Sequence, residues 1–324
     1  MRRPAGDGRL PPVPRPIIID TDPGQDDAVA ILMALASPEL EVVGITTVAG
    51  NVPQPLVTEN ALRLVELAGR PDVPVYAGAR RPLLRPLVTA EEVHGPTGLD
   101  GADLPPPRTA PADGHAVDFI VEACRRAEGE GITLCPIGPL TNLALALVKE
   151  PDIVEGIREI VVMGGASFEG GNTTPPAEFN IYVDPHAAHV VFTSGVPITL
   201  MPLDVTHRAL VVPDQLERIR GLGTRVGDAV AGMLDYYERH DVEKYGIEGA
   251  PLHDPCVIAY LLEPAIFTGK ACHVAVETSS ELTMGTTVVD WWGVGGGTPN
   301  AVVMRDVDAD EFFELVIDRL ARLG

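Results

Sequence analysis

The sequence predicts an α/β fold in a single domain, with a doubly wound, mostly parallel sheet flanked by helices. Three observations predict this fold. Strand-like and helix-like segments alternate through the first two thirds of the 324 residues, as they do when helices connect parallel strands. The strand-like segments are short apolar runs, which is typical of strands buried on both faces. The chain is 45% hydrophobic and only 5% aromatic, so it can supply a large aliphatic core.

The first elements carry clear signals. PIII at 16–19 is a short apolar run and predicts a buried strand. DDAVAILMALAS at 26–37 predicts a helix, because acidic residues in the first turn complement the helix dipole. The β-branched run at 40–48 predicts the second strand. The following elements alternate in the same way: a helix at about 55–68, a strand at 73–78, a helix at 116–127, a strand at 132–138, a helix at 141–150, a strand at 159–165, a helix at 184–195 and a strand at 197–204.

Two of these helices have recognisable first residues. Thr141 opens the helix at 141–150, and Asp184 is a predicted N-cap because Pro185 follows it at the first helical position. Beyond residue 204 a few extra strands and helices are added to the Rossmann-like core. They are predicted as helices near 212–221, 225–243 and 254–262, strands at 272–277, 284–290 and 300–304, and a closing amphipathic helix at 308–323.

No linker or internal repeat divides the chain, so residues 16–324 are predicted to form one domain. The basic, proline-rich segment 1–15 predicts a disordered arm. The loops 80–113 and 166–178 are long and rich in Gly, Pro and Thr. Long loops of this kind in a compact domain are often functional.

Charge and cysteine usage exclude several function classes. The formal net charge is −22, from 46 acidic and 24 basic residues, which disfavours nucleic acid and anionic membrane surfaces as partners. No apolar run reaches the roughly 18 residues that a transmembrane helix needs. The cysteines form no C-x-x-C pair and are predicted to be buried free thiols, as in a reducing, cytoplasmic setting; they are Cys124, Cys135, Cys256 and Cys272.

The stretch PIIIDTDPGQDDAVAIL at 16–32 crowds Asp20, Asp22, Asp26 and Asp27 between a strand and a helix. In an open α/β sheet, ligands bind beyond the carboxyl ends of the strands. Capping of the helix explains one or two of these residues but not four, since crowded carboxylates repel one another. A divalent cation removes that repulsion, and the absence of soft ligands nearby favours Ca²⁺.

The spacing alone does not select the reaction. A strand that ends in D-x-D is also typical of haloacid-dehalogenase-type phosphatases, which use Mg²⁺ and an aspartate nucleophile. That alternative expects Thr or Val soon after the second aspartate, whereas Pro23 and Gly24 follow directly here. A non-catalytic protein that binds calcium and ribose is a third interpretation.

Taken with GITTVAGN, HGPTG, AEFN and HDPC, the stretch DTDPGQDDAVAI resembles the inosine–uridine-preferring nucleoside hydrolase family. The matches occur in the family's order from about residue 16 to the C-terminus. The resemblance implies a catalytic domain that splits ribonucleosides into base and ribose with Ca²⁺, through an oxocarbenium-like transition state. It also implies a homodimer or homotetramer.

The resemblance further implies a metal site and a general base. Asp22 corresponds to the base that takes a proton from the attacking water, and it also ligates the metal. Asp27, Asp254 and the backbone carbonyl of Ile137 correspond to the other ligands. Taken alone, Asp254 precedes Pro255 and an apolar helix, so it is also a candidate N-cap that needs no metal.

The substrate contacts are likewise implied by the family. Asp26 and Asn51 resemble ligands of the ribose hydroxyls, and His253 is the candidate that protonates the leaving base. The other matching positions would line the sugar or the base: His94, Met163, Glu178, Asn180 and Tyr237. Each of these has an ordinary interpretation as a turn, core or surface residue when taken alone. Trp291 and Trp292 have no matching pair in the family and are predicted to be interface or core residues, and the preferred base stays open.

Overall fold

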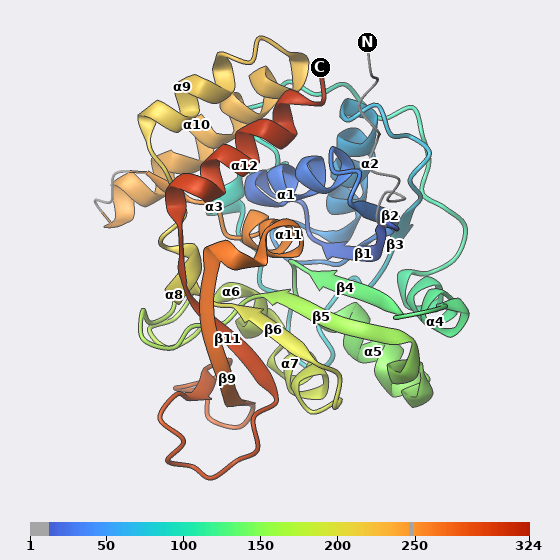
Figure 1. Ribbon diagram of the computed structural model, residues 1–324, viewed down its shortest axis with the longest axis vertical. Helices are drawn as coiled ribbons and strands as arrows, with labels where there is room; N and C mark the ends of the chain where they lie inside the picture. The colour runs from blue at the N-terminus through green and yellow to red at the C-terminus, as the bar shows by residue number, and fades with distance from the viewer. Residues whose placement is uncertain (1–12, 246–248) are drawn as a thin grey trace, which may run out of the picture.

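The fold is a layered α/β structure around one large sheet (Figure 1). The computed structural model describes residues 13–245 and 249–324, and the side chains of 240–245 lie outside that description. Within the described residues, the sheet has nine strands in the order β10-β9-β11-β6-β5-β4-β1-β2-β3. The predicted arm falls mostly on residues 1–12, outside the described residues, and Arg15 is already the first residue of β1.

Seven neighbouring strands of the sheet are parallel, as predicted. They are β1 (Arg15–Thr21), β2 (Leu40–Thr47), β3 (Val75–Ala77), β4 (Ile132–Pro136), β5 (Ile157–Met163), β6 (Ile198–Met201) and β11 (Ala301–Val307). Two antiparallel strands, β9 (Phe267–Val276) and β10 (Thr287–Asp290), complete the sheet beyond β11. A separate small ribbon pairs β7 (Leu210–Val211) with β8 (Ala250–Pro251).

Helices cover both faces, which explains why the strands read as apolar runs. In β1, Ile17 and Ile19 enter one hydrophobic cluster and Ile18 the other, and burial of each side chain contributes roughly 1.5–3 kcal/mol. The first cluster packs under α1 (Gln25–Leu35), α2 (Gln54–Leu67), α9 (Pro213–Arg220), α10 (Arg225–Tyr245), α11 (Pro255–Leu262) and α12 (Ala309–Ala321). The second packs under α4 (Ala116–Arg126), α5 (Thr141–Lys149) and α7 (Pro185–Phe192).

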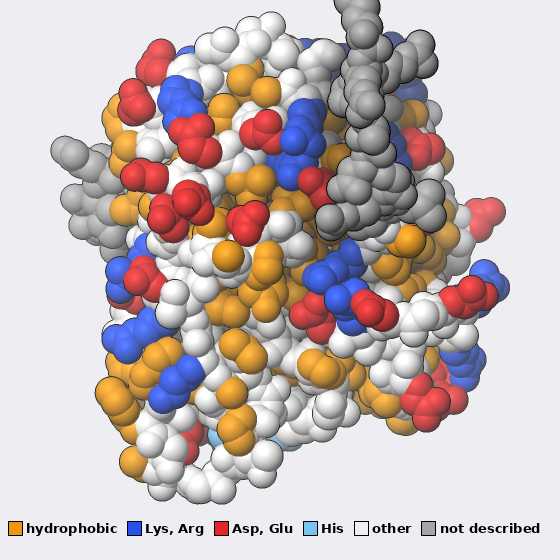
Figure 2. All heavy atoms as spheres, in the orientation of Figure 1, with side chains coloured by type: hydrophobic (Ala, Val, Ile, Leu, Met, Phe, Trp, Pro, Cys, Tyr) orange, Lys and Arg blue, Asp and Glu red, His pale blue; other side chains and the backbone are white. Residues whose placement is uncertain are grey.

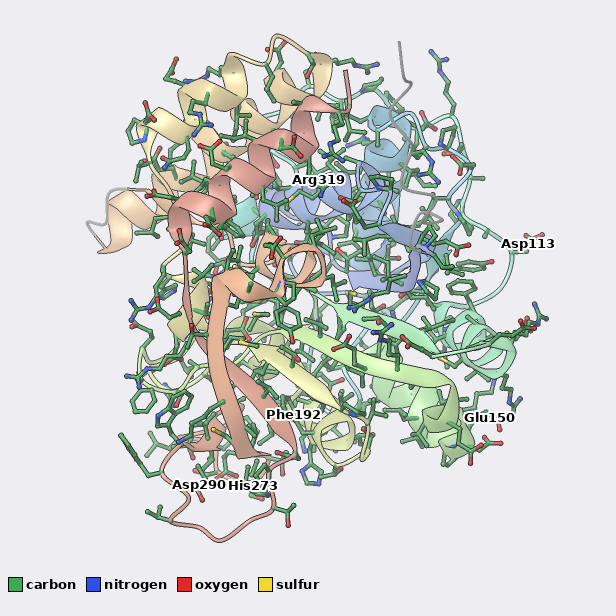
Figure 3. All side chains as sticks on the ribbon, viewed as in Figure 1. Asp113, Glu150, Phe192, His273, Asp290 and Arg319 are labelled. Carbon is green, nitrogen blue, oxygen red and sulfur yellow. The ribbon has the colours of Figure 1, made fainter. Side chains whose placement is uncertain are left out.

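Contacts between distant segments fix the outer helices. Arg319 lies on α12 (Figure 3). Its guanidinium pairs at 2.9 Å with Glu39, the residue before β2. Acidic side chains gather over α9 and α12 on the face shown in Figure 2, with basic ones between them.

Among the helices that the structure describes, none combines the length and apolar character needed to cross a bilayer. The four cysteines are buried and unpaired, as predicted.

Some element boundaries differ from prediction for identifiable reasons. The predicted strand 197–204 ends at Met201, because Pro202 lacks an N–H for the sheet, and the short helix α8 (Leu203–Thr206) follows. β9 begins five residues earlier than predicted because its first half is exposed and therefore has no apolar run. The short segments α3 (Glu91–His94), α6 (Phe179–Val183), η1 (Pro151–Gly156) and η2 (Pro264–Ile266) lie in turns that periodicity does not reveal.

Candidate active site

Asp22 lies just past the carboxyl end of β1, in a position that two glycines make possible. A Cβ atom on Gly50 would lie 2.0 Å from its Oδ2, and one on Gly138 would lie 2.4 Å from its Oδ1. Its Oδ2 accepts the backbone N–H of Asn51 at 2.7 Å. Its Oδ1 is buried and has no hydrogen-bond donor within the described part of the chain. The carboxylate is therefore held rigidly with one oxygen left for a ligand.

Asp27 caps the first turn of α1 with its side chain. Its Oδ2 accepts the N–H of Gly24 at 2.9 Å and its Oδ1 accepts the Thr21 hydroxyl at 2.5 Å, which confirms that one of the four aspartates caps the helix. The Asn51 side chain donates to Oδ2 of Asp27 at 3.2 Å and to the carbonyl of Asp22 at 3.1 Å. Asn51 thereby bridges the two aspartates.

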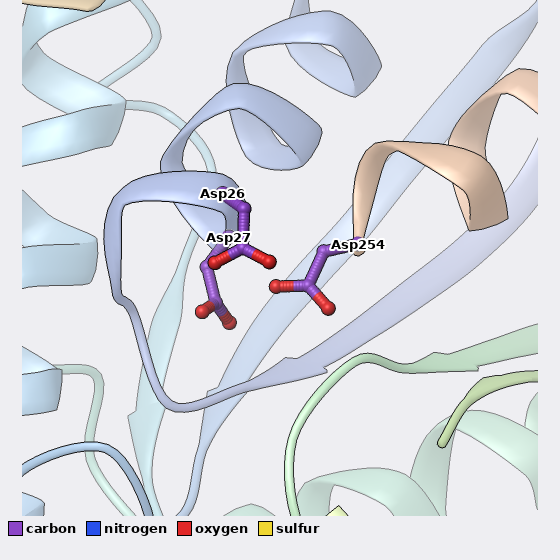
Figure 4. Close-up of side chains that lie close together, drawn as sticks. All are labelled: Asp26, Asp27 and Asp254. Carbon is purple, nitrogen blue, oxygen red and sulfur yellow. The ribbon is translucent and has the colours of Figure 1, made fainter. Parts of the chain in front are cut away.

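Asp254 stands directly before α11, but its side chain makes no capping hydrogen bond. Its backbone is already helical, with φ −69° and ψ −36°, so its carboxylate does not fold back over the helix end. It points instead towards Asp26 and Asp27, and one oxygen from each of the three lies within 4.8 Å of the others (Figure 4). The interpretation of the Asp254 side chain as an N-cap is therefore wrong.

In this buried arrangement the carboxylates lose protons less readily than they would in water, so their pKa values are raised. Burial, and after it the charge of Asp27, raise the pKa of Asp26 to about 8. Burial and Asp27 likewise raise the pKa of Asp22, and burial with Asp26 raises that of Asp254. Within the described residues no arginine or lysine forms an ion pair with this group. Buried like charges without a cation are stabilised when a dication binds between them.

Asp20 has a different environment from the other three N-terminal aspartates. Its Oδ1 accepts from the Thr46 hydroxyl at 2.6 Å and from Asn142 Nδ2 at 2.8 Å. Burial raises its pKa to about 7. Asn142 also bonds the carbonyl of Thr47 and the N–H of Ala79, so the pair Asp20–Asn142 joins β1, β2 and α5 beneath the site.

A second group of residues lies where β4 and β5 end. Asn180 Nδ2 donates to the carbonyl of Ile137 at 3.0 Å and to that of Met163 at 3.3 Å. Glu178 is the N-cap of α6, accepting from the N–H of Asn180 at 2.9 Å and from that of Gly165 at 2.8 Å. Burial raises the pKa of Glu178 to about 7.

The candidate base-facing residues lie on other elements. The rings of His94 and Tyr237 stack with centroids 5.5 Å apart. His253 Nδ1 lies 2.7 Å from the Thr206 hydroxyl. Burial, followed by the nearby His207 and His94, holds the pKa of His253 well below its usual value, so this ring is neutral at pH 7.

Comparison with known proteins decides the family. The model of the inosine-uridine preferring nucleoside hydrolases matches residues 17–314. The chain belongs to that family. It is 54% identical over 307 residues to an uncharacterized protein of Schizosaccharomyces pombe, covering 95% of this chain and 99% of the other.

Two further relatives of this nucleoside hydrolase carry activities in their names. The pyrimidine-specific ribonucleoside hydrolase RihA of Klebsiella pneumoniae subsp. pneumoniae is 49% identical over 307 residues, with 94% of this chain and 98% of that protein covered. The structure of a purine-preferring ribonucleoside hydrolase from Gardnerella vaginalis superimposes with a TM-score of 0.89 at 33% identity, covering 95% and 99% of the two chains.

Family membership confirms both the α/β fold and the class of enzyme. The protein is a hydrolase of N-glycosyl compounds, in a family that acts on ribonucleosides. The phosphatase and the non-catalytic binding protein are thereby set aside as alternatives.

The structure brings most predicted site residues into two neighbouring groups. Asp22, Asp27 and Asn51 bond one another, and Asp26 joins Asp27 and Asp254 in the carboxylate cluster. Asp26 was predicted as a ribose ligand, whereas it also stands among the candidate metal ligands. The residues that sequence reasoning missed are Gln25, Asn142 and Thr206, each joined to a site residue far away in the chain.

The paired tryptophans lie on the outside of the sheet's antiparallel end. Trp292 is 76% exposed, so it is not a core residue. Trp291 is partly buried and meets Phe168 edge to face, with centroids 5.9 Å apart. Lys270 lies over both tryptophan rings. This arrangement leaves an interface as the remaining prediction for Trp292.

Proposed function

We propose that this protein hydrolyses the N-glycosidic bond of ribonucleosides in a calcium-dependent reaction that gives free base and ribose. The observation that carries the proposal is the buried cluster of Asp26, Asp27 and Asp254, whose nearest oxygens lie within 4.8 Å. The Asp254 side chain makes no capping hydrogen bond, so its carboxylate has no role at the start of α11. This supports the proposed metal site. A dication between the three side chains would neutralise their repulsion.

The chemistry of the donor set fits calcium. Ca²⁺ takes several carboxylate and carbonyl oxygens, whereas Mg²⁺ usually takes one or two carboxylates together with substrate phosphates. A ribonucleoside brings no phosphate. Asp22, Asp27, Asp254 and the carbonyl of Ile137 would hold the ion, with the Asp26 carboxylate beside those of Asp27 and Asp254. When bound, calcium would orient the ribose hydroxyls and lower the pKa of the attacking water.

Asp22 would act as the general base. Its Oδ2 already accepts from Asn51, so Oδ1, which is buried and has no donor among the residues that the structure describes, is the atom that would take the proton from water. Gly50 and Gly138 pack closely against the two oxygens and keep the carboxylate in one orientation. A positioned general base accelerates such reactions by roughly 10²–10⁴-fold.

The ribose would lie between the two groups of residues. Asp26 and Asn51 would bind its hydroxyls, while Glu178 and Asn180 would hold its 5′ side. Met163 would line this pocket, and its sulfur lies 3.4 Å from Asn180 Nδ2. Oxygen atoms fixed near the ring can stabilise the positive charge that develops as the glycosidic bond breaks.

His253 would protonate the departing base, with His94 and Tyr237 on the same side of the sugar. Burial lowers the pKa of His253, so the neutral ring would donate its N–H as a hydrogen bond to the leaving nitrogen, and full transfer of a proton would require the ring to take one up from water first. The Thr206 hydroxyl fixes the ring through Nδ1. This leaves Nε2 as the atom that would face the leaving nitrogen.

A substrate panel tests the proposal. Inosine, uridine, cytidine, adenosine and phosphorylated analogues are each incubated with calcium or with a chelator, and free base and ribose are measured. We expect at least one unphosphorylated ribonucleoside to be cleaved in a chelator-sensitive reaction. Release of phosphate, or cleavage that the chelator does not affect, would contradict the proposal. The relatives are named for opposite base preferences, so the panel also determines that preference.

We also propose that the enzyme is a cytoplasmic homodimer or homotetramer. The four buried, unpaired cysteines suit a reducing compartment. Light scattering on the purified chain measures the assembly, and a monomeric mass would contradict this part of the proposal.

A further inference from the structure

Gln25 is a fully buried amide whose orientation is fixed by the backbone. It is the first residue of α1 and is 0% exposed. Its Nε2 donates to the carbonyl of His94 at 3.0 Å and to that of Asp100 at 3.1 Å. Both acceptors are backbone oxygens, so the NH₂ group must face them. The other atom, Oε1, therefore faces His94 Nδ1, at 2.7 Å.

This orientation determines where His94 carries its proton. An amide oxygen only accepts hydrogen bonds, so Nδ1 of His94 must be the donor. In a neutral imidazole with a proton on Nδ1, Nε2 is an acceptor. Rotation of the His94 ring is restricted by its neighbours. Its Nδ1–Cε1 edge packs against Gly24, where a Cβ would lie 2.4 Å from Nδ1, and its face stacks on Tyr237.

We propose that Gln25 is a positioning residue that holds His94 in the Nδ1–H tautomer, so that neutral His94 accepts a hydrogen bond from the ribonucleoside through Nε2. The inference rests on the proposed function and deepens it, because it removes neutral His94 as the acid for the leaving base. The substrate group that meets His94 must then carry an N–H or an O–H.

His253 has the opposite kind of partner. Its Nδ1 lies 2.7 Å from the Thr206 hydroxyl, which, unlike the oxygen of Gln25, can donate a hydrogen bond. His253 can therefore carry its proton on Nε2. The neighbours therefore assign the tautomer of His94, whereas the Thr206 hydroxyl permits either tautomer of His253, including the one that donates through Nε2.

The tautomer can be measured without any activity assay. Long-range ¹H–¹⁵N correlation spectra of the full-length protein, labelled at histidine, distinguish Nδ1–H from Nε2–H rings. The His94 signal is assigned by its loss in a His94→Asn spectrum. We expect a neutral ring protonated on Nδ1 in the wild type and a mixture of tautomers in Gln25→Met. A wild-type ring protonated on Nε2 would overturn the proposal, and this holds even if Gln25→Met fails to fold.

Kinetics supply the second readout. Loss of one hydrogen bond from a correctly oriented acceptor should raise KM in Gln25→Met by roughly 3–10-fold, with a smaller change in kcat. Gln54→Met is the matched control. Gln54 is likewise the first residue of its helix and is 3% exposed, but its amide donates to Thr58, so this variant should keep both the KM and the His94 tautomer.

The outcomes of the two proposals are separable. If the wild type cleaves no ribonucleoside, the proposed function fails, while the spectra still decide the tautomer. If Gln25→Met keeps a His94 ring protonated on Nδ1 and an unchanged KM, the positioning role of Gln25 is wrong even though hydrolysis is established.

Discussion

Replacing Asp254 with Asn should stabilise the protein in chelator and remove most of the stabilisation that calcium gives. The Asp254 side chain makes no capping hydrogen bond at the start of α11, so the substitution by Asn removes no contact that stabilises the helix. Its oxygen lies within 4.8 Å of oxygens of Asp26 and Asp27. At 4.8 Å, the upper limit of that spacing, two ionised carboxylates repel by about 3.5 kcal/mol at an effective dielectric constant of about 20. Protonation relieves part of this repulsion at pH 7, so the gain from Asn in chelator is at most about 3 kcal/mol.

These free energies convert into measurable melting temperatures. At roughly 2.1 cal/mol/K per residue, the 324 residues give an unfolding entropy of about 0.7 kcal/mol/K. Asp254→Asn should therefore melt up to about 4 °C above the wild type in chelator. Calcium at about 100 times its dissociation constant should add about 2.7 kcal/mol, or about 4 °C, to the wild type. The variant should gain less than about 1 °C, because it has lost a ligand.

Asp184→Asn is the matched control in this differential scanning experiment. Asp184 also stands before a proline at a helix start and is fully buried, but its carboxylate caps α7 by accepting from Ala187 at 3.0 Å. Asn caps a helix as well as Asp does, but its NH₂ group would replace Oδ2, which accepts from the Leu83 N–H and the Thr141 hydroxyl, both at 2.8 Å. The replacement should therefore cost about 1–3 kcal/mol in both buffers. The reasoning is refuted if Asp254→Asn lowers the melting temperature equally with chelator and with calcium.

Three other predictions concern different parts of the site. Asp22→Asn should lower kcat by about 10²–10⁴-fold with an unchanged circular dichroism spectrum; near-normal turnover would remove the general-base role. Gly50→Ala should also reduce kcat at least tenfold, because the new methyl would lie 2.0 Å from Asp22 Oδ2, and a wild-type rate would mean that the carboxylate position is not critical. Burial raises the pKa of Glu178 from 4.5 to about 7, so its contribution to stability is fully present below pH 4.5 and is lost as the pH rises through 7. Urea titrations of wild type and Glu178→Gln should therefore diverge by about 3 kcal/mol across that window, and parallel pH profiles would contradict the raised pKa.

The sequence is informative where local pattern and tertiary environment agree. The strands β1, β2, β4 and β5 are apolar on both faces because helices cover both sides, and such runs are visible without a structure. The crowding at 20–27 is equally visible, since four carboxylates at a strand–helix junction exceed what capping needs. These two features were sufficient to predict that carboxylates gather at the carboxyl end of the sheet, where the structure has Asp26, Asp27 and Asp254 together.

Asp254 shows where local pattern fails. Asp254-Pro255 and Asp184-Pro185 are the same dipeptide at the start of a helix, and both predict an N-cap. Only Asp184 uses its carboxylate for capping. The difference lies in the backbone angles and in the distant α1 aspartates, neither of which a single sequence contains.

The supporting residues could not be found from spacing. Gln25 and His94 are 69 positions apart, Thr206 and His253 are 47 apart, and Asp20 and Asn142 are 122 apart. Asp20 meets Asn142 because β1 and β4 are neighbours in the sheet, whereas the other two pairs join residues in the connections between strands. A lone buried glutamine, threonine or asparagine gives no signal of its partner.

The central claim is that the buried carboxylates hold a calcium ion that hydrolysis requires. The most direct test strips the wild-type enzyme with a chelator, removes the chelator, and follows ribose release from a cleaved ribonucleoside as calcium is titrated back. The account predicts a negligible rate for the stripped enzyme and a full, saturable recovery at one calcium per chain. Full activity in the stripped enzyme, with no bound metal detectable by atomic spectroscopy, would contradict it.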